Sequence, residues 1–63
     1  MQVSIIIVNY NTKELIKNCI NSIYKYTQDI QYEIIVSDNG STDGSIEMLN
    51  KLRYLVNTKI LQV

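Results

Sequence analysis

The chain has 63 residues, which is less than one ordinary domain, and its six Lys and Arg residues balance six Asp and Glu residues. Because these charges are scattered without a basic stripe, the sequence argues against binding to nucleic acid or to an anionic surface. A single cysteine rules out an internal disulfide, and a chain without histidine has neither a Cys/His zinc cluster nor a Ser/His triad. The composition therefore indicates a reducing, cytoplasmic setting.

Hydropathy argues against insertion into a membrane. The longest apolar run, residues 5–8, is far shorter than the roughly 20 residues of a membrane span, and no basic region precedes it. A chain below about 70 residues usually needs a disulfide, a metal or association to supplement its core. We therefore expect the isolated chain to self-associate.

The first expected element is a strand near residues 2–8, whose β-branched run lacks polar alternation and suits a strand buried on both faces of a parallel sheet. A polar cluster follows, in which Asn11 or Thr12 can cap a helix, with Glu14 placed to reach back if Asn11 is the cap. Apolar residues at helical spacing then predict an amphipathic helix near residues 12–27. Its stripe runs through Leu15, Cys19 and Ile23, flanked by Ile16, Ile20 and Tyr24, with the Cys19 thiol acting as a small hydrophobe.

Two more strands and one more helix are expected further along the chain. The strands lie near residues 32–37 and 59–63, and the helix near residues 44–56. A strand, a helix and a strand in such a short span form a βαβ unit, with parallel strands and a right-handed crossover. The predicted fold class is therefore α/β, a parallel, three-layer, Rossmann-like sheet of βαβαβ order with strand order 3-2-1. The second helical stripe consists of Ile46, Leu49, Leu52 and Val56.

A loop of eight small or polar residues, residues 38–45, follows the second strand. Ligands of open α/β sheets bind beyond the carboxyl ends of the strands, so this loop and the residues after the first strand form the candidate ligand site. Neither a Gly-rich dinucleotide fingerprint nor a Gly-Lys-Ser/Thr phosphate loop is present. A classical dinucleotide-binding domain is therefore disfavoured.

Two sequence blocks carry a resemblance to a known family. The first is Val-Ser-Ile-Ile-Ile-Val-Asn-Tyr-Asn at residues 3–11, and the second is Glu-Ile-Ile-Val-Ser-Asp-Asn-Gly-Ser-Thr-Asp-Gly-Ser at residues 33–45. At this separation, and each at a strand end, they resemble the opening of family 2 glycosyltransferases. The resemblance covers nearly the whole chain. It implies that residues 1–63 are the N-terminal, nucleotide-facing fragment of a GT-A fold.

The resemblance also implies a nucleotide-binding site. In that family the tyrosine after the first strand packs on the base and an acidic residue after the second strand accepts a hydrogen bond from it. These roles fall by resemblance to Tyr10 and Asp38. A uracil or thymine ring has an N–H donor and two flat faces, which a carboxylate and a phenol ring can contact. An acid followed by Asn39 resembles the subgroup associated with deoxysugar donors such as dTDP-rhamnose. The expected nucleotide-binding residues are Val8, Asn9, Tyr10, Asn11, Asp38 and Asn39.

Catalysis is expected to lie outside this chain. The family holds a divalent metal, Mn or Mg, and the sugar diphosphate with an Asp-any-Asp motif at a later strand, and its catalytic base lies further downstream. Neither occurs here, since the only Asp residues are Asp29, Asp38 and Asp43. We therefore expect this chain to hold no metal and to transfer no sugar. The parent enzyme is expected to use a UDP- or dTDP-sugar and a glycan or lipid-linked acceptor, in cell-wall or polysaccharide synthesis, in the cytoplasm with peripheral association to the membrane.

The site residues also have structural interpretations that the sequence leaves open. Residues 38–40 suit a hairpin turn, and Asp43 suits a helix cap. Tyr10 can cover the sheet edge, and Asn9 and Asn11 can cap the local backbone. For the whole chain, the alternative function is a non-catalytic α/β module for nucleotide binding or assembly.

Overall fold

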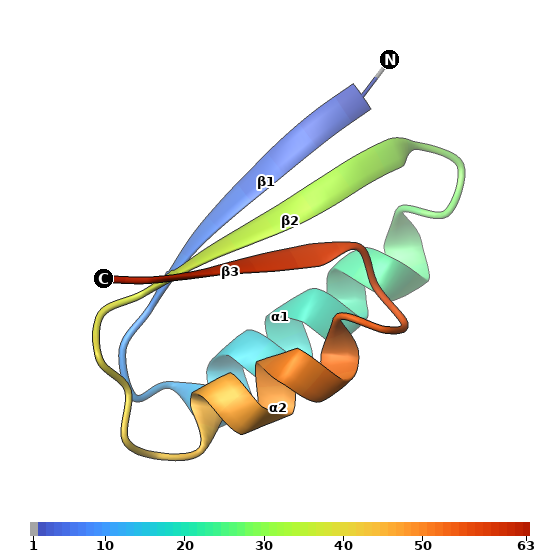
Figure 1. The fold of residues 1–63 in the computed structure, drawn as a ribbon. Helices are drawn as coiled ribbons and strands as arrows, with labels where there is room; N and C mark the ends of the chain where they lie inside the picture. Colours follow the sequence, from blue (N-terminus) through green and yellow to red (C-terminus); the bar gives the residue numbers. More distant parts are fainter. Residues whose placement is uncertain (1) are drawn as a thin grey trace.

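Strands and helices alternate along the chain. They run from β1 (Gln2–Asn9) through α1 (Lys13–Tyr26), β2 (Gln31–Asp38) and α2 (Ser45–Leu52) to β3 (Thr58–Gln62). The computed structural model describes residues 2–63. β2 is the central strand and pairs in parallel with β1 on one side and β3 on the other (Figure 1). The α/β class, the parallel pairing and the strand order expected from the sequence are confirmed.

The register brings the three strand ends to the same edge of the sheet, called here the carboxyl edge. Asn9 of β1 lies beside Asp38 of β2, and Gln62 of β3 lies on the other side of Asp38. The β1–α1 loop (residues 10–12) and the β2–α2 loop (residues 39–44) both leave from this edge (Figure 1). Segments that are about 30 positions apart in the sequence therefore meet where ligands of open α/β sheets bind.

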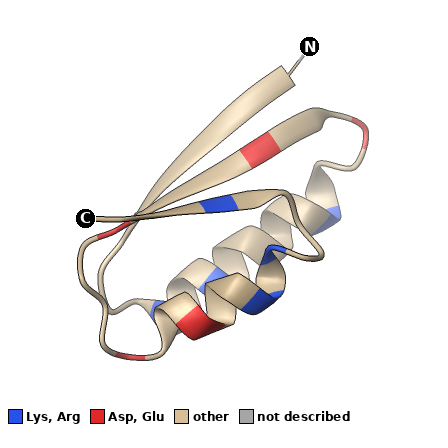
Figure 2. Ribbon diagram, viewed as in Figure 1, with Lys and Arg blue, Asp and Glu red and all other residues tan. Residues whose placement is uncertain are grey.

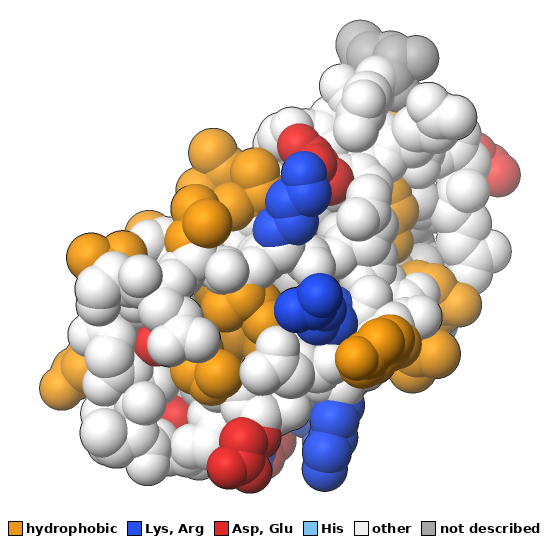
Figure 3. Space-filling view, viewed as in Figure 1, with side chains coloured by type: hydrophobic (Ala, Val, Ile, Leu, Met, Phe, Trp, Pro, Cys, Tyr) orange, Lys and Arg blue, Asp and Glu red, His pale blue; other side chains and the backbone are white. Residues whose placement is uncertain are grey.

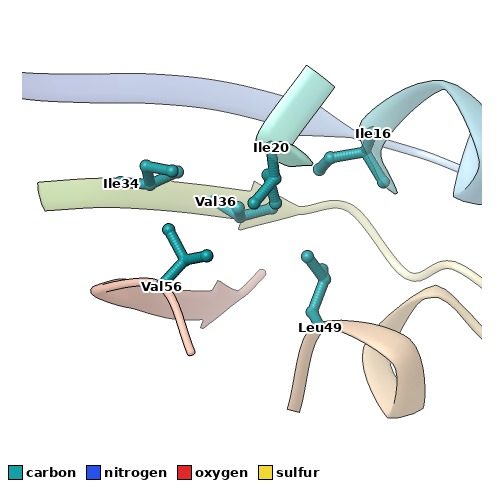
Figure 4. Packing of buried hydrophobic residues seen from close by; sticks show 6 residues of the cluster. All are labelled: Ile16, Ile20, Ile34, Val36, Leu49 and Val56. Atoms are coloured by element: carbon teal, nitrogen blue, oxygen red, sulfur yellow. The ribbon is translucent and has the colours of Figure 1, made fainter. Parts of the chain in front are cut away.

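Both helices lie against the same face of the sheet (Figure 1). The chain moves from β1 to β2 and on to β3 in one direction, and crossovers of one hand then place their helices on one side. Figure 4 shows the core between the two layers, where side chains of β2 meet those of both helices. The buried hydrophobic residues are Ile16, Ile20, Ile34, Val36, Leu49 and Val56.

The opposite face of the sheet, called here the open face, is exposed in residues 2–63. Ile6 is 71% exposed, Val8 67% and Leu61 57%, and Figure 3 shows hydrophobic side chains at the surface along the sheet. Ile5 and Ile7 point the other way and pack against the core. The expectation that β1 is buried on both faces is therefore wrong for the described residues. They supply the sheet and one helical layer, and the second helical layer of a three-layer arrangement is not among them.

α1 buries a different stripe from the expected one. Ile16 and Ile20 are buried and Ile23 packs against the core, whereas Leu15 is 71% exposed and Cys19 is exposed. The interpretation of Cys19 as an interior hydrophobe is therefore wrong. The sequence offers two adjacent apolar rows on this helix, and contact with the sheet selects the row that contains the two buried isoleucines.

α2 ends at Leu52, earlier than the expected end at residue 56. After it, the backbone N–H groups of Leu55 and Val56 both donate to the Leu52 carbonyl at 2.9 Å. This tightened turn directs Val56 into the core at 4% exposure and leaves Leu55 74% exposed. The other elements begin and end within one residue of their expected bounds.

Charged residues lie mainly on the helices and loops (Figure 2). Within residues 2–63 the one ion pair joins Lys59 Nζ to Glu33 Oε2 at 3.4 Å, between neighbouring strands. In the same residues, no helix combines the length and the apolar character that a membrane crossing requires.

Candidate ligand site at the carboxyl edge

Asp38 is the buried centre of the carboxyl edge, with a side chain only 1% exposed. Its Oδ1 accepts hydrogen bonds from Asn9 Nδ2 at 2.7 Å and from Ser41 Oγ at 2.6 Å. Its Oδ2 accepts from the backbone N–H groups of Gly40 at 3.1 Å and Ser41 at 2.9 Å. Burying a carboxylate is costly unless donors replace water, and here four donors do so.

The charge on Asp38 is stabilised by these donors. Burial opposes ionisation, but the hydrogen bonds from Ser41, Asn9 and Gly40 outweigh it and hold the pKa of the carboxyl below its ordinary value of 3.8. At neutral pH the group is therefore an anion that only accepts hydrogen bonds, and its acceptor sites are filled by the protein itself.

Asn9 links the end of β1 to both loops from a fully buried position. Its Nδ2 donates to Asp38 and also to Ser41 Oγ at 3.1 Å. Its Oδ1 accepts from the Thr12 hydroxyl at 2.6 Å. Thr12 occupies the cap position of α1, but its hydroxyl donates to Asn9 and makes no capping bond to the helix. A cap from the Thr12 side chain, one of the two that the sequence allows, is therefore wrong, because the nearby Asn9 Oδ1 competes for the hydroxyl.

Asp43 caps both helices. Its Oδ1 accepts from the backbone N–H of Ser45 at 3.0 Å and from the Ser45 hydroxyl, and its Oδ2 accepts from the backbone N–H of Lys13 at 3.0 Å. Lys13 and Ser45 are the first residues of α1 and α2, whose N–H groups lack partners within their own helices. The bond from the Ser45 hydroxyl is the main cause that lowers the pKa of Asp43. The capping interpretation of Asp43 is confirmed, and the same carboxylate also serves the helix that begins 30 positions earlier.

Asn11 joins the two loops. Its φ of 50° lies in the left-handed region, which Asn tolerates better than most residues. Its backbone N–H donates to Ser41 Oγ at 2.9 Å, and its Oδ1 accepts from the backbone N–H of Thr42 at 2.7 Å. The side chain therefore bridges to the other loop, and it does not cap α1.

The exposed part of the site consists of side chains directly after the paired strand ends. Tyr10 is 59% exposed, and Asn39 is exposed while its backbone N–H donates to the Asn9 carbonyl at 3.0 Å. Val8 lies on the open face. All six residues expected from the sequence therefore gather at the carboxyl edge. They divide into a buried pair, Asn9 and Asp38, and an exposed group, Val8, Tyr10, Asn11 and Asn39.

The hairpin interpretation of residues 38–40 is wrong, because β2 and β3 are parallel and the loop leads into α2. Asp38 nevertheless accepts bonds from the two N–H groups that follow, as in a local Asx turn. Figure 2 shows the acidic positions of this segment at the end of β2 and in the loop before α2. A shallow hollow of about 430 Å³ lies beside the loops, lined by Asn11, Thr12, Lys13, Glu14, Leu15 and Asp43.

Sequence reasoning missed Ser41, a residue of the β2–α2 loop that bonds to the β1–α1 loop and to both strand ends. Its side chain contacts Asp38, Asn9 and the backbone of Asn11. A usable signal was present, because a Ser three positions after an Asp in a polar loop is typical of a hydroxyl and a carboxylate that bond locally.

A metal site does not fit the described residues. Within residues 2–63, no three His, Cys, Asp or Glu side chains gather as a ligand set. The carboxylates of Asp38 and Asp43 also accept hydrogen bonds from protein donors on both of their oxygens.

Comparison with known proteins adds an independent observation. The sequence model of the family described as glycosyl transferase family 2 matches residues 4–61. The chain is 42% identical over 53 residues to an uncharacterized glycosyltransferase, YfnE, of Bacillus subtilis, covering 84% of the chain and 14% of that protein. It is 41% identical over 54 residues to the poly(ribitol-phosphate) beta-glucosyltransferase of Bacillus spizizenii, covering 84% of the chain and 8% of that protein.

A third relative is the abequosyltransferase RfbV of Salmonella typhimurium. It is 42% identical over 64 residues, which cover 97% of the chain and 19% of that protein. The chain therefore spans at most 19% of the length of any of these three relatives.

Proposed function

The chain belongs to glycosyl transferase family 2, and on this premise we propose that it is the nucleotide-binding part of a longer enzyme. That enzyme transfers a sugar from a UDP- or dTDP-sugar to a hydroxyl group of a glycan or lipid-linked acceptor. Support for sugar transfer comes from the three relatives, each of which is named for that activity. Support for a polymeric acceptor comes from the relative named for poly(ribitol-phosphate). A polymeric acceptor is in line with a role in cell-wall or polysaccharide synthesis, which we include in the proposal.

One observation carries the proposal: exposed Tyr10 and Asn39 directly follow strand ends that are buried and held together. The phenol ring of Tyr10 offers an aromatic face for a base. The side-chain amide of Asn39 offers both a donor and an acceptor, which is what the pairing edge of a uracil or thymine requires.

The burial of Asp38 supports a division of roles within the site. A base that bonded directly to this carboxylate, as expected from the sequence, would have to displace one of four protein donors at a side chain that is 1% exposed. We therefore assign contact with the base edge to Asn39 and support of the loop to Asp38.

Titration of the purified, ¹⁵N-labelled chain with UDP, dTDP and GDP, followed by NMR, tests this site. Amide shifts should centre on Tyr10 and Asn39 for UDP and dTDP, with weak affinity and a smaller response to GDP. Tyr10→Ala should lower affinity roughly tenfold, because stacking of a base on an aromatic ring contributes about 1–3 kcal/mol. Tyr54→Ala is the matched control, since Tyr54 is 85% exposed and lies beyond α2. Equal affinity of the Tyr10→Ala variant and the wild type would contradict the proposal.

The proposal assigns the divalent metal, Mn or Mg, and the catalytic base to parts of the enzyme outside this chain. Nucleotide binding by the chain should therefore be the same with Mn²⁺ as with EDTA. The chain incubated with a UDP- or dTDP-sugar, an acceptor and Mn²⁺ should release no nucleoside diphosphate above a buffer blank. Turnover by the chain alone would overturn this division. A parent reading frame without an Asp-any-Asp motif would instead favour a non-catalytic binding module.

A further inference from the structure

The Ser41 hydroxyl connects the two loops of the site. It donates to Asp38 Oδ1 at 2.6 Å and accepts from Asn9 Nδ2 at 3.1 Å and from the Asn11 backbone N–H at 2.9 Å. A serine hydroxyl has one donor and two acceptor lone pairs, so these three bonds use its whole capacity. Its own backbone N–H also donates to Asp38, at 2.9 Å. We call this arrangement, together with the bond between Asn11 and Thr42, the loop clasp.

The clasp acts on the residue next to Tyr10. Asn11 has a left-handed φ of 50°, a conformation that Asn tolerates better than most residues and that the surroundings stabilise here. Ser41 holds its backbone N–H, and the backbone N–H of Thr42 holds its Oδ1 at 2.7 Å. On the other side of Tyr10, Asn9 is fully buried. The backbone that carries the exposed Tyr10 ring is therefore fixed at both ends. Ser41 bonds to both anchors, but Asn9 is also held by Asp38 and Thr12. The Asn11 anchor therefore depends on Ser41 more strongly.

We propose that Ser41 is a positioning residue of the nucleotide site, whose hydroxyl ties the Tyr10 loop to the Asn39 loop before the ligand binds. The proposal rests on the proposed function, because Tyr10 and Asn39 are the residues assigned to the base. Its physical basis is pre-organisation, since a loop that is ordered only on binding lowers the affinity. Removal of the hydroxyl leaves the Asn9–Asp38 bond in place but releases the backbone of Asn11.

The test compares Ser41→Ala, Ser41→Thr and the wild type in two measurements. The first is amide hydrogen exchange without ligand, in which Ser41→Ala should speed exchange at Asn11 and Thr42 about two- to tenfold. The amide of Ile34, which donates to the Asn57 carbonyl at 2.8 Å, should be unaffected. The second is affinity for UDP and dTDP, which should fall about two- to tenfold in Ser41→Ala. Ser41→Thr keeps a hydroxyl and should restore both values.

Two further variants serve as controls. Ser4→Ala also removes a serine hydroxyl bond, to Glu33 Oε1 at 2.9 Å, but away from the carboxyl edge, and it should change neither measurement at the loops. Asn11→Gly keeps the bond from the backbone of residue 11 to Ser41 and suits a positive φ, but it removes the bond to Thr42. It should speed exchange at Thr42 alone, and it tests the clasp where Ser41→Ala fails to fold.

Unchanged exchange at Asn11 and Thr42 in Ser41→Ala would overturn the clasp. Faster exchange with unchanged nucleotide affinity would overturn the positioning role, since the clasp would then serve stability alone. If the wild-type chain binds neither UDP nor dTDP, the proposed function fails, whereas the exchange rates still support or overturn the clasp.

Discussion

The core beneath the sheet and the carboxyl edge are both buried, but different forces hold them. Ile34 and Leu49 are fully buried by apolar packing, which has no direction. Asn9 and Asp38 are at most 1% exposed, and hydrogen bonds of defined geometry hold them in place. Packing tolerates substitutions of equal volume, whereas a buried polar network tolerates only side chains with the same donors and acceptors. Conservative substitutions should therefore separate the two regions.

The largest effect is expected in the core. Leu49→Ala should destabilise the chain by about 2–5 kcal/mol because it loses transfer free energy and leaves a cavity. A chain this small has little stability in reserve, so the variant should lose its cooperative unfolding transition. Leu49→Met keeps the volume and should cost less than about 1.5 kcal/mol. Urea unfolding followed by circular dichroism measures both, and equal losses in the two variants would contradict core packing at this position.

At the carboxyl edge, by contrast, a substitution that keeps the volume should still be destabilising. Asp38→Asn changes almost no volume, but it places an NH₂ group against donors from Asn9, Gly40 and Ser41. Unsatisfied buried donors cost about 1–3 kcal/mol, so this substitution should destabilise more than Leu49→Met. Urea midpoints measured side by side give the comparison. A tolerated Asp38→Asn would mean that the network contributes little to folding.

Acid should weaken the carboxyl edge and not the apolar core, although Glu33, whose pKa is lowered by its bonds with Ser4 and Lys59, adds to the effect. The pKa values of Asp38 and Asp43 lie below 3.8 in the folded chain, so the folded state favours their ionised forms. The stabilisation is fully present above about pH 3.8, and it is lost as the pH falls through the lowered pKa values. Urea midpoints should thus be steady from about pH 7 to pH 5 and fall below about pH 4. The fall should be smaller in Asp38→Asn, and a stability that increases on acidification would refute this assignment.

The smallest effect on folding is expected on the open face. Ile6→Thr and Val8→Thr replace side chains that are 71% and 67% exposed, so each should change stability by no more than about 0.5 kcal/mol. Exposed apolar surface favours association, and the double variant should sediment as a smaller species than the wild type. A wild-type chain that is already monodisperse and monomeric would contradict the expected self-association.

Much of the fold follows from local patterns in the sequence. The β-branched runs and the helical spacing of apolar residues locate all five elements, because periodicity is a property of neighbouring residues. The candidate site was located in the same way, since polar residues after two consecutive parallel strands must meet at the carboxyl edge. The cap at Asp43 was also predictable, because an acid before a helix finds free N–H groups wherever that helix packs.

The tertiary structure alone decided which groups are buried. α1 carries two apolar rows, and contact with the sheet selects Ile16 and Ile20 over Leu15 and Cys19. The four donors that make Asp38 an internal acceptor include Asn9, which is 29 positions away, and no local pattern reveals such a partner. Burial and hydrogen bonding depend on residues brought together from distant parts of the chain, so the roles within the site follow from the fold.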